Sequence, residues 1–326
     1  MKLSDIGERK AIDLISKNLN RGDTAVWIGD DCAALDFDDK YLLITTDMIN
    51  EKTHISKEMK PFQIGWFIVA INLSDIAAKG GKPIGLTLAL GLPSNTSDIF
   101  LKELMKGADA CAKQYKTSII GGDTKENDIL TICGTSFGVV KKDFFMARKG
   151  TKPKDIVAVT GTIGGAGAGY YSIQHKIKDT SLKKILFEPK PKIYEGIALA
   201  KEKIITTSMD LSDGLSSSLY QLQKINKVGF EIDLDRLPIS PLLLKLQKQH
   251  KINTLQYALH FGGDYELLLT MPSDKFQQAK KTIEKTGNTL TNIGIVTKKK
   301  EILQISNGNI TKLENKGFEH FKSHIF

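Results

Sequence analysis

The chain has 326 residues, of which 41% are hydrophobic and 25% are charged, as in an ordinary globular protein with room for two domains. The net charge is +9, but the lysines are spread along the chain without the aromatic-rich or zinc-finger patterns of nucleic-acid-binding domains. We therefore expect no nucleic-acid partner. The lack of a secretory signal, of clustered cysteines and of a membrane-length apolar run favours a cytoplasmic protein with no membrane partner.

The first part of the chain is predicted to mix helices and strands. Apolar spacing predicts a helix over 7–19, and the apolar run 40–47 predicts a strand that ends at Asp47. A long helix is expected from Pro61 to Lys79, because proline stands at its start and two glycines follow it. We then expect a strand, a helix, a strand that runs into a glycine turn, and a further strand, over 84–92, 97–116, 117–123 and 129–140.

A polar and basic segment with glycine and proline, 141–155, predicts a domain boundary, so we expect domains over 1–145 and 146–326. The second domain is expected to open with a strand and a glycine-rich turn, followed by several strands and helices that include a helix over 215–226. Both halves mix strands with helices, so the fold class is α/β or α+β, and the pattern alone leaves this choice open.

Aspartates stand at or near the ends of predicted apolar elements in both halves. They are Asp30, Asp31, Asp47, Asp75, Asp123, Asp210 and Asp213. Any one of them alone is typical of a helix cap or a turn. If they converge, their mutual repulsion requires cations, and we expect divalent ions to neutralise the adjacent Asp30 and Asp31 in particular.

Carboxylates and threonine hydroxyls, without a histidine or cysteine cluster, suit Mg²⁺. A magnesium site of several aspartates predicts phosphoryl transfer. The common nucleotide motifs are absent from the sequence: "GGKP" is no Walker A loop, the glycine-rich stretch 161–170 lacks dinucleotide spacing, and no protein-kinase set occurs. We interpret 161–170 as a tight strand-to-helix packing segment.

Several segments together resemble the thiamine-monophosphate kinase family, across essentially the whole chain. They are "IGDDCA", "TTDMINEKTH", "NLSDIAAKGGKP", "IIGGDT", "MDLSDGL", "FGGDYELLLT" and the closing "KGFEHF". The resemblance implies the two-domain fold of aminoimidazole ribonucleotide synthetase relatives, with an N-terminal sheet that pairs across a homodimer. It also implies direct in-line transfer of phosphate from ATP to thiamine monophosphate with Mg²⁺, the final step of thiamine diphosphate biosynthesis.

The resemblance also implies roles for individual residues. Those implied to bind metal are Asp30, Asp31, Thr45, Thr46, Asp47, Asp75, Asp123, Asp210 and Asp213. Those implied to contact ATP are Gly122, Asp123, Arg148 and Ser212. Those assigned to the substrate are His54, Phe318 and Asp264, the last as a stand-in, because Gly263 occupies the place of the family's usual acidic residue. No general base is assigned, since a phosphate monoester is already largely ionised near neutral pH.

Other functions of related proteins fit the sequence less well. Selenophosphate synthetase would need a reactive cysteine in a glycine-rich segment ahead of "IGDD", and aminoimidazole ribonucleotide synthetase would carry a different motif at "TTDMINEKTH". A non-catalytic nucleotide-binding relative would be expected to have lost some acidic positions, and here they are filled.

Overall fold

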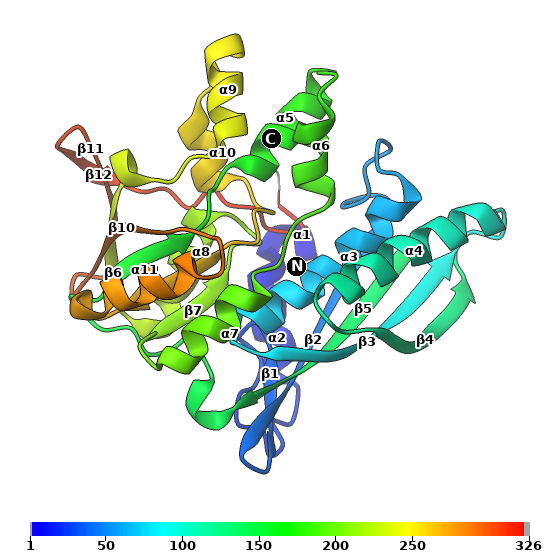
Figure 1. Ribbon diagram of the computed structural model, residues 1–326, viewed down its shortest axis with the longest axis horizontal. Helices are drawn as coiled ribbons and strands as arrows, with labels where there is room; N and C mark the ends of the chain where they lie inside the picture. Colours follow the sequence, from blue (N-terminus) through cyan, green and yellow to red (C-terminus); the bar gives the residue numbers. More distant parts are fainter. Residues whose placement is uncertain (1, 323–326) are drawn as a thin grey trace.

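The computed structural model describes residues 2–322, which form two mixed β-sheets with helices packed against them (Figure 1). The first sheet has the strand order β1-β2-β5-β3-β4. Its strands are β1 (Ala33–Phe37), β2 (Lys40–Asn50), β3 (Lys82–Leu92), β4 (Ile119–Glu126) and β5 (Thr131–Lys141). Only β3 and β4 run parallel in this sheet, and its other neighbouring strands are antiparallel.

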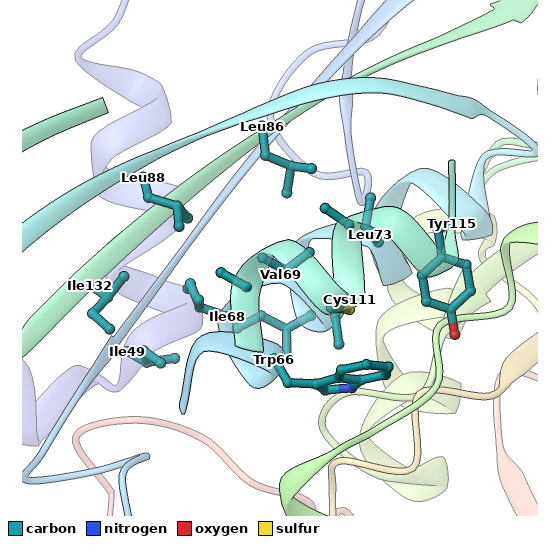
Figure 2. Close-up of a cluster of buried hydrophobic side chains, with 14 of the residues drawn as sticks. Ile49, Trp66, Ile68, Val69, Leu73, Leu86, Leu88, Cys111, Tyr115 and Ile132 are labelled. Atoms are coloured by element: carbon teal, nitrogen blue, oxygen red, sulfur yellow. The ribbon is translucent and has the colours of Figure 1, made fainter. Parts of the chain in front are cut away.

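Helices α3 (Pro61–Ala78) and α4 (Asp98–Gln114) cover one face of the first sheet. Figure 2 shows this core, in which Leu73 of α3 lies near Leu86 of the sheet and Cys111 of α4. Helix α3 is apolar almost all round because it packs on β2 and β5 and also on two elements of the second half of the chain, α7 (Ile193–Glu202) and β7 (Thr207–Asp210). Within the described residues it is the one helix long and apolar enough to cross a membrane, and 72% of that window is buried in the protein.

The opposite face of the first sheet is uncovered in the single chain. Alternation along β2 turns Ile49 into the core and leaves Met48 on the other side, with 57% of its surface exposed. On β4, Ile119 packs against the core whereas Ile120 is exposed. An apolar face of this kind is unusual for a chain that acts alone.

The second sheet has the order β12-β11-β8-β10-β6-β9-β7, with β8 and β11 as its parallel pair. Its strands are β6 (Ile156–Thr160), β7 (Thr207–Asp210), β8 (Gly229–Asp233), β9 (Leu267–Met271), β10 (Leu290–Thr297), β11 (Ile302–Ser306) and β12 (Asn309–Lys312). Most pairs are antiparallel, so the structure lies on the α+β side of the predicted class.

Helices cover both faces of the second sheet. Helices α8 (Leu215–Asn226) and α10 (Thr254–His260) share one apolar cluster with it, and α7 (Ile193–Glu202) and α11 (Phe276–Glu284) share another. The remaining helices are α1 (Leu3–Ile6), α2 (Glu8–Lys17), α5 (Gly165–Gln174), α6 (Thr180–Phe187), α9 (Pro241–His250) and the short η1 (Lys142–Phe144), η2 (Leu234–Arg236) and η3 (Ser273–Lys275). The change of sheet falls between β5 and β6, and the expected boundary at 145/146 lies in this connection.

The predicted helices over 7–19, 61–79, 97–116 and 215–226 are confirmed within a few residues. Two strand predictions are wrong in extent: β2 continues past Asp47, and β4 continues through its glycines to Glu126 without a turn. Gly122 is instead explained by strand packing, because a Cβ there would lie 1.9 Å from the carbonyl oxygen of Leu88. Close packing of 161–170 is observed, but at Gly167 it is between helices and not strand to helix, since a Cβ there would lie 2.8 Å from the Tyr257 side chain of α10.

Candidate active site

Acidic residues from both sheets meet beside helix α3. Alternation along β2 places Thr45 and Asp47 on the face that packs toward α3. Asp75 lies on α3 itself, and Asp210 is the last residue of β7 in the second sheet. One carboxylate oxygen from each of Asp31, Asp75 and Asp210 lies within 4.8 Å of the others. The structure therefore brings these three predicted residues together.

Hydrogen bonds orient two of these carboxylates. The Thr45 hydroxyl donates to Asp75 Oδ2 at 2.5 Å, and the Ser74 hydroxyl donates to Asp210 Oδ2 at 2.6 Å. Asp210 Oδ1 is buried and has no hydrogen-bond partner among the described residues. A buried oxygen of this kind is costly unless something binds it. Its hard-oxygen chemistry and its carboxylate neighbours fit Mg²⁺.

Nearby positive charge does not outweigh burial and repulsion for the carboxylates around this point, although Arg9 and Arg148 oppose the rise in pKa at Asp213 and Arg148 opposes it at Asp210. Burial, with repulsion from Asp213 and Asp31, raises the pKa of Asp47 to about 6. Burial and the Asp31 charge raise the pKa of Asp210 to about 7. Burial and the nearby Asp47 raise the pKa of Asp75 well above its usual range, and burial also raises that of Asp213. A divalent cation would remove the repulsion that causes part of these shifts.

The adjacent Asp30 and Asp31 are in a different environment. The Lys79 ammonium lies 2.5 Å from Asp30 Oδ1 and 2.7 Å from Asp31 Oδ2, and it donates to the Ser208 carbonyl at 2.8 Å. Arg148 Nε donates to Asp31 Oδ1 at 2.8 Å, and the Arg148 backbone N–H donates to Asp30 Oδ2 at 2.9 Å. Burial alone would raise the pKa of Asp31, but Arg148 and Lys79 outweigh it and lower that pKa.

This arrangement corrects one expectation from the sequence. Divalent ions are not required to neutralise Asp30 and Asp31, because side chains of the protein already supply the positive charge. Lys79 comes from the end of α3 and Arg148 from the connection between the sheets, so the sequence gives no local sign of either pairing.

The residues predicted for ATP are divided between two places. Arg148 lies at the acidic cluster, and the Ser212 carbonyl accepts a hydrogen bond from the Gly263 N–H at 2.7 Å. Asp123 is exposed on β4 and forms an ion pair with Lys125 at 3.2 Å. Since β4 is three strand spacings from β2, Asp123 lies on the order of 14 Å from the cluster's strand at ~4.8 Å per spacing. The nucleotide roles of Gly122 and Asp123 stay predictions.

The structure does not bring Thr46 to the cluster. Alternation along β2 points it to the uncovered face of the sheet, opposite to Thr45 and Asp47. Its hydroxyl lies 2.9 Å from the hydroxyl of Thr135 on the neighbouring strand β5. A metal contact by the Thr46 side chain within one chain is therefore not supported by this geometry.

Two of the predicted substrate residues lie close together beside the acidic cluster. The ring of His320 is 5.2 Å from that of His54 and 4.7 Å from that of Phe318. The Phe318 N–H donates to the Asp213 carbonyl at 3.2 Å, so the C-terminal segment crosses the cluster's edge. Burial, with a contribution from His320, lowers the pKa of His54 to about 4, so this imidazole is neutral near pH 7.

The third predicted substrate residue, Asp264, binds the backbone of the glycine-rich segment. Its carboxylate accepts hydrogen bonds from the Gly164 and Ala166 N–H groups at 2.6 and 3.0 Å, at the start of α5. Burial raises its pKa to about 6 despite these bonds. The preceding Gly263 has φ +89°, in the left-handed region that favours glycine. Contact of Asp264 with substrate stays a prediction, and its observed role is to stabilise the glycine-rich segment.

Sequence reasoning missed several residues at this site. Lys79 was interpreted only as the end of a helix, although its i,i+4 spacing from Asp75 puts both on one helix face. Arg9 of α2 brings a guanidinium nitrogen within 3.9 Å of Asp213 Oδ2. Tyr265 has φ +51°, unusual for a non-glycine residue, and burial and the cluster's carboxylates raise its pKa well above the usual range. No local pattern could have revealed Arg9 or Tyr265.

A cavity of ≈ 400 Å³ lies elsewhere in the second domain. It is lined by Leu234, Asn253, Leu255, Gln256, Leu259, His260, Gln304 and Lys316. None of the predicted site residues lines it. The acidic cluster is the better candidate for chemistry because its groups are buried, convergent and electrostatically unbalanced.

The fold and the site define a class of protein. The family model described as AIR synthase related protein, N-terminal domain, matches residues 29–140, and the corresponding C-terminal domain matches residues 152–305. The first range contains the first sheet up to the penultimate residue of β5, and the second range contains the second sheet except for Ser306 of β11 and the edge strand β12. The chain is thus a two-domain protein of the AIR synthase-related class.

Individual relatives narrow the class to a family. The thiamine-monophosphate kinase of Methanospirillum hungatei is 36% identical over 258 residues, covering 79% of this chain and 85% of the relative. The thiamine-monophosphate kinase of Escherichia coli K12 is 33% identical over 310 residues, covering 93% and 94% of the two chains. The chain belongs to the thiamine-monophosphate kinase family, and it is a kinase.

A solved structure supports the same assignment. The structure named AaThiL complexed with AMPPCP and TMP superposes with a TM-score of 0.88 at 29% identity, covering 98% of this chain and 99% of that one. The predicted two-domain architecture is therefore confirmed over almost the whole length.

Proposed function

We propose that this chain transfers the γ-phosphoryl group of ATP to the phosphate of thiamine monophosphate, forming thiamine diphosphate and ADP. The observation that carries the proposal is the meeting of Asp31, Asp75 and Asp210 from both sheets, with Asp210 Oδ1 buried and unpartnered. The relatives are thiamine-monophosphate kinases, and the similar AaThiL structure holds AMPPCP and TMP. Such a cluster suits the binding of a polyphosphate through metal.

Mg²⁺ would be held by Asp31, Asp75 and Asp210, with Asp47 close enough to raise the pKa of Asp75 and Asp213 close enough to raise that of Asp47. When bound, it would neutralise charge on the phosphates. The chain itself orients the carboxylate oxygens: the Thr45 hydroxyl donates a hydrogen bond to Asp75, and the Ser74 hydroxyl donates one to Asp210. Arg148 holds Asp31 and places a guanidinium at the same point, where it adds positive charge toward an anionic substrate.

The substrate end of the site is proposed at His54 and Phe318. A neutral imidazole and an aromatic ring suit the aromatic rings of a thiamine better than they suit another phosphate. The segment that carries Phe318 is tied to Asp213, so the organic part of the substrate would lie next to the metal-binding carboxylates.

The activity is tested with purified protein, ATP, thiamine monophosphate and MgCl₂, by chromatography of thiamine diphosphate and ADP. We expect equal amounts of both products, loss of both in EDTA, and turnover lowered by about 10²–10³ in an Asp75→Asn variant. A Lys102→Met variant serves as control, since Lys102 lies exposed on α4, where it pairs with the exposed Asp98, away from the predicted site residues. ATP hydrolysis without thiamine diphosphate, in the presence of the substrate, would contradict the proposal. Free thiamine as acceptor tests substrate choice.

We also propose that the chain acts as a homodimer in the cytoplasm. The uncovered face of the first sheet, with exposed Met48 and Ile120, supports pairing with a second copy through that face. A Met48→Glu variant should shift the mass measured by light scattering from dimer to monomer. A wild-type protein that is monomeric at micromolar concentration would contradict the dimer. Buried Cys32 and Cys111, both free thiols, agree with a reducing compartment.

A further inference from the structure

Lys79 is a cation enclosed by the protein. Its side chain is 0% exposed and is among the largest fully buried side chains of the described residues. A buried ammonium is strongly unfavourable unless oxygens surround it. Here the carboxylates of Asp30 and Asp31 and the carbonyl of Ser208 lie within 2.8 Å of Nζ.

These three oxygens come from separate parts of the fold. Asp30 and Asp31 precede β1 of the first sheet, and Ser208 lies on β7 of the second sheet, directly before the strand's last two residues. Lys79 stands four residues after Asp75 on the same face of α3. One ammonium group therefore fixes the distance between the Asp31 carboxylate and the carboxylates of Asp75 and Asp210.

The contacts of Lys79 are those that a small divalent cation would have, with two carboxylate oxygens and a carbonyl oxygen as ligands. We propose that Lys79 is a positioning residue that stands in for a divalent cation beside Asp30 and Asp31. It thereby removes the need for added metal between Asp30 and Asp31 and leaves metal binding to the place where Asp31 meets Asp75 and Asp210. This inference rests on the magnesium site of the proposed function, but concerns which part of the cluster needs added metal.

The test compares cation binding without nucleotide in four proteins. They are the wild type, Lys79→Met, the exposed-lysine control Lys82→Met and the double variant Lys79→Met with Asp30→Asn. Methionine keeps the length of the buried side chain but removes its charge. The double variant removes one negative charge as well, so it restores the balance that Lys79 provides.

Mn²⁺ is titrated into each protein, and free Mn²⁺ is measured by electron paramagnetic resonance. Lys79→Met should bind one Mn²⁺ per chain more than the wild type, and Mg²⁺ should raise its melting temperature further than that of the wild type. Lys82→Met and the double variant should match the wild type in both measurements. A role of Lys79 in packing alone would lower stability without adding a bound ion.

An unchanged or smaller number of bound Mn²⁺ ions in Lys79→Met would overturn the inference, as would an extra ion retained in the double variant. If Lys79→Met does not fold without metal, the inference requires that Mg²⁺ or the Asp30→Asn change restores folding, and failure of both overturns it. The proposed function is judged separately, from thiamine diphosphate formation by the wild type. A wild type that makes the product while Lys79→Met binds no extra ion refutes only the inference.

Discussion

Two corners of one acidic cluster differ in how their charge is balanced. The paired corner consists of Asp30, Asp31, Lys79 and Arg148, and its carboxylates are matched by buried side-chain cations. The open corner consists of Asp47, Asp75, Asp210 and Asp213, whose pKa values are all raised. Asp31 belongs to the paired corner, yet its carboxylate also lies within 4.8 Å of the open corner's Asp75 and Asp210.

The difference shows that aspartates have two roles at the same site, one in stabilising the fold and one in binding metal. Carboxylates of the paired corner hold the segment 29–31, α3 and β7 together. Their ion pairs are largely buried and are also hydrogen bonds of good geometry. Carboxylates of the open corner repel one another and are stable together only when protonated or bound to a cation. The first set should therefore govern stability, and the second should govern metal binding and rate.

The largest expected effect is on stability, from Asp31→Asn. This change leaves the buried Lys79 cation and the partly exposed Arg148 cation without their shared partner, so the free energy of unfolding of the metal-free protein should fall by about 3–5 kcal/mol. Urea unfolding followed by circular dichroism measures it. The control is Asp143→Asn, whose ion pair with Lys203 is exposed and should contribute less than about 1 kcal/mol. Equal losses in the two variants would remove the distinction between buried and exposed pairs.

The next effect is on rate, from Asp75→Asn in the open corner. Loss of this carboxylate should lower kcat by about 10²–10³, the range for removal of one directed electrostatic group. The metal-free protein should be no less stable than the wild type, because a repelling charge is removed. Turnover at saturating Mg²⁺ and urea unfolding without Mg²⁺ measure the two parts. Near-normal turnover, or a large loss of metal-free stability, would place Asp75 with the paired corner instead.

The sequence predicted the acids of the open corner and the fold around them well. Apolar runs and helical spacing are local patterns, so the strands, the helices and the aspartates at or near their ends, such as Asp47, Asp75 and Asp210, could be identified from the residues alone. The predicted ends of β2 and β4 were wrong because polar and glycine residues inside a strand resemble the end of a strand. In the structure, pairing with the neighbouring strands β5 and β3 continues past these residues.

The paired corner could not be predicted in the same way. Its partners are 49 and 117 residues apart in sequence, so no window contains both charges of a pair. A lysine in "AAKGGKP" is read as a solvated charge after a helix unless the fold that encloses it is known. For the same reason divalent ions were expected where Lys79 and Arg148 are found.

A smaller effect should appear when pH is varied without metal. Folding raises the pKa values of Asp47 to about 6 and Asp210 to about 7, so the folded state holds these protons more tightly than the unfolded chain does. The stabilising contribution is full below the unfolded pKa, near 4, and is lost as pH rises through 6 and 7. Metal-free protein should therefore lose about 2–4 kcal/mol of stability between pH 5 and pH 8, the upper figure being the sum over the two carboxyl groups.

Urea unfolding at a series of pH values in EDTA measures this loss. Mg²⁺ should reduce it, because the bound cation favours the ionised carboxylates. Asp210→Asn should also show a shallower slope without metal. A metal-free protein that gains stability from pH 5 to pH 8 would mean that the open corner is already compensated, and the contrast between the corners would disappear.

The smallest effect separates two neighbouring threonines that the family resemblance treats alike. Thr45 donates to Asp75 Oδ2, whereas Thr46 faces the other side of the sheet and contacts Thr135. Thr45→Val should lower kcat/KM about tenfold, which is the low end of the effect expected from losing a hydrogen bond to a charged group that contributes about 1.5–3 kcal/mol. Thr46→Val should change kcat/KM by less than about twofold, because the hydrogen bond it removes is solvent-exposed and neutral. Equal losses would show that both faces of β2 take part in the reaction, and the open corner would then have to extend through the sheet.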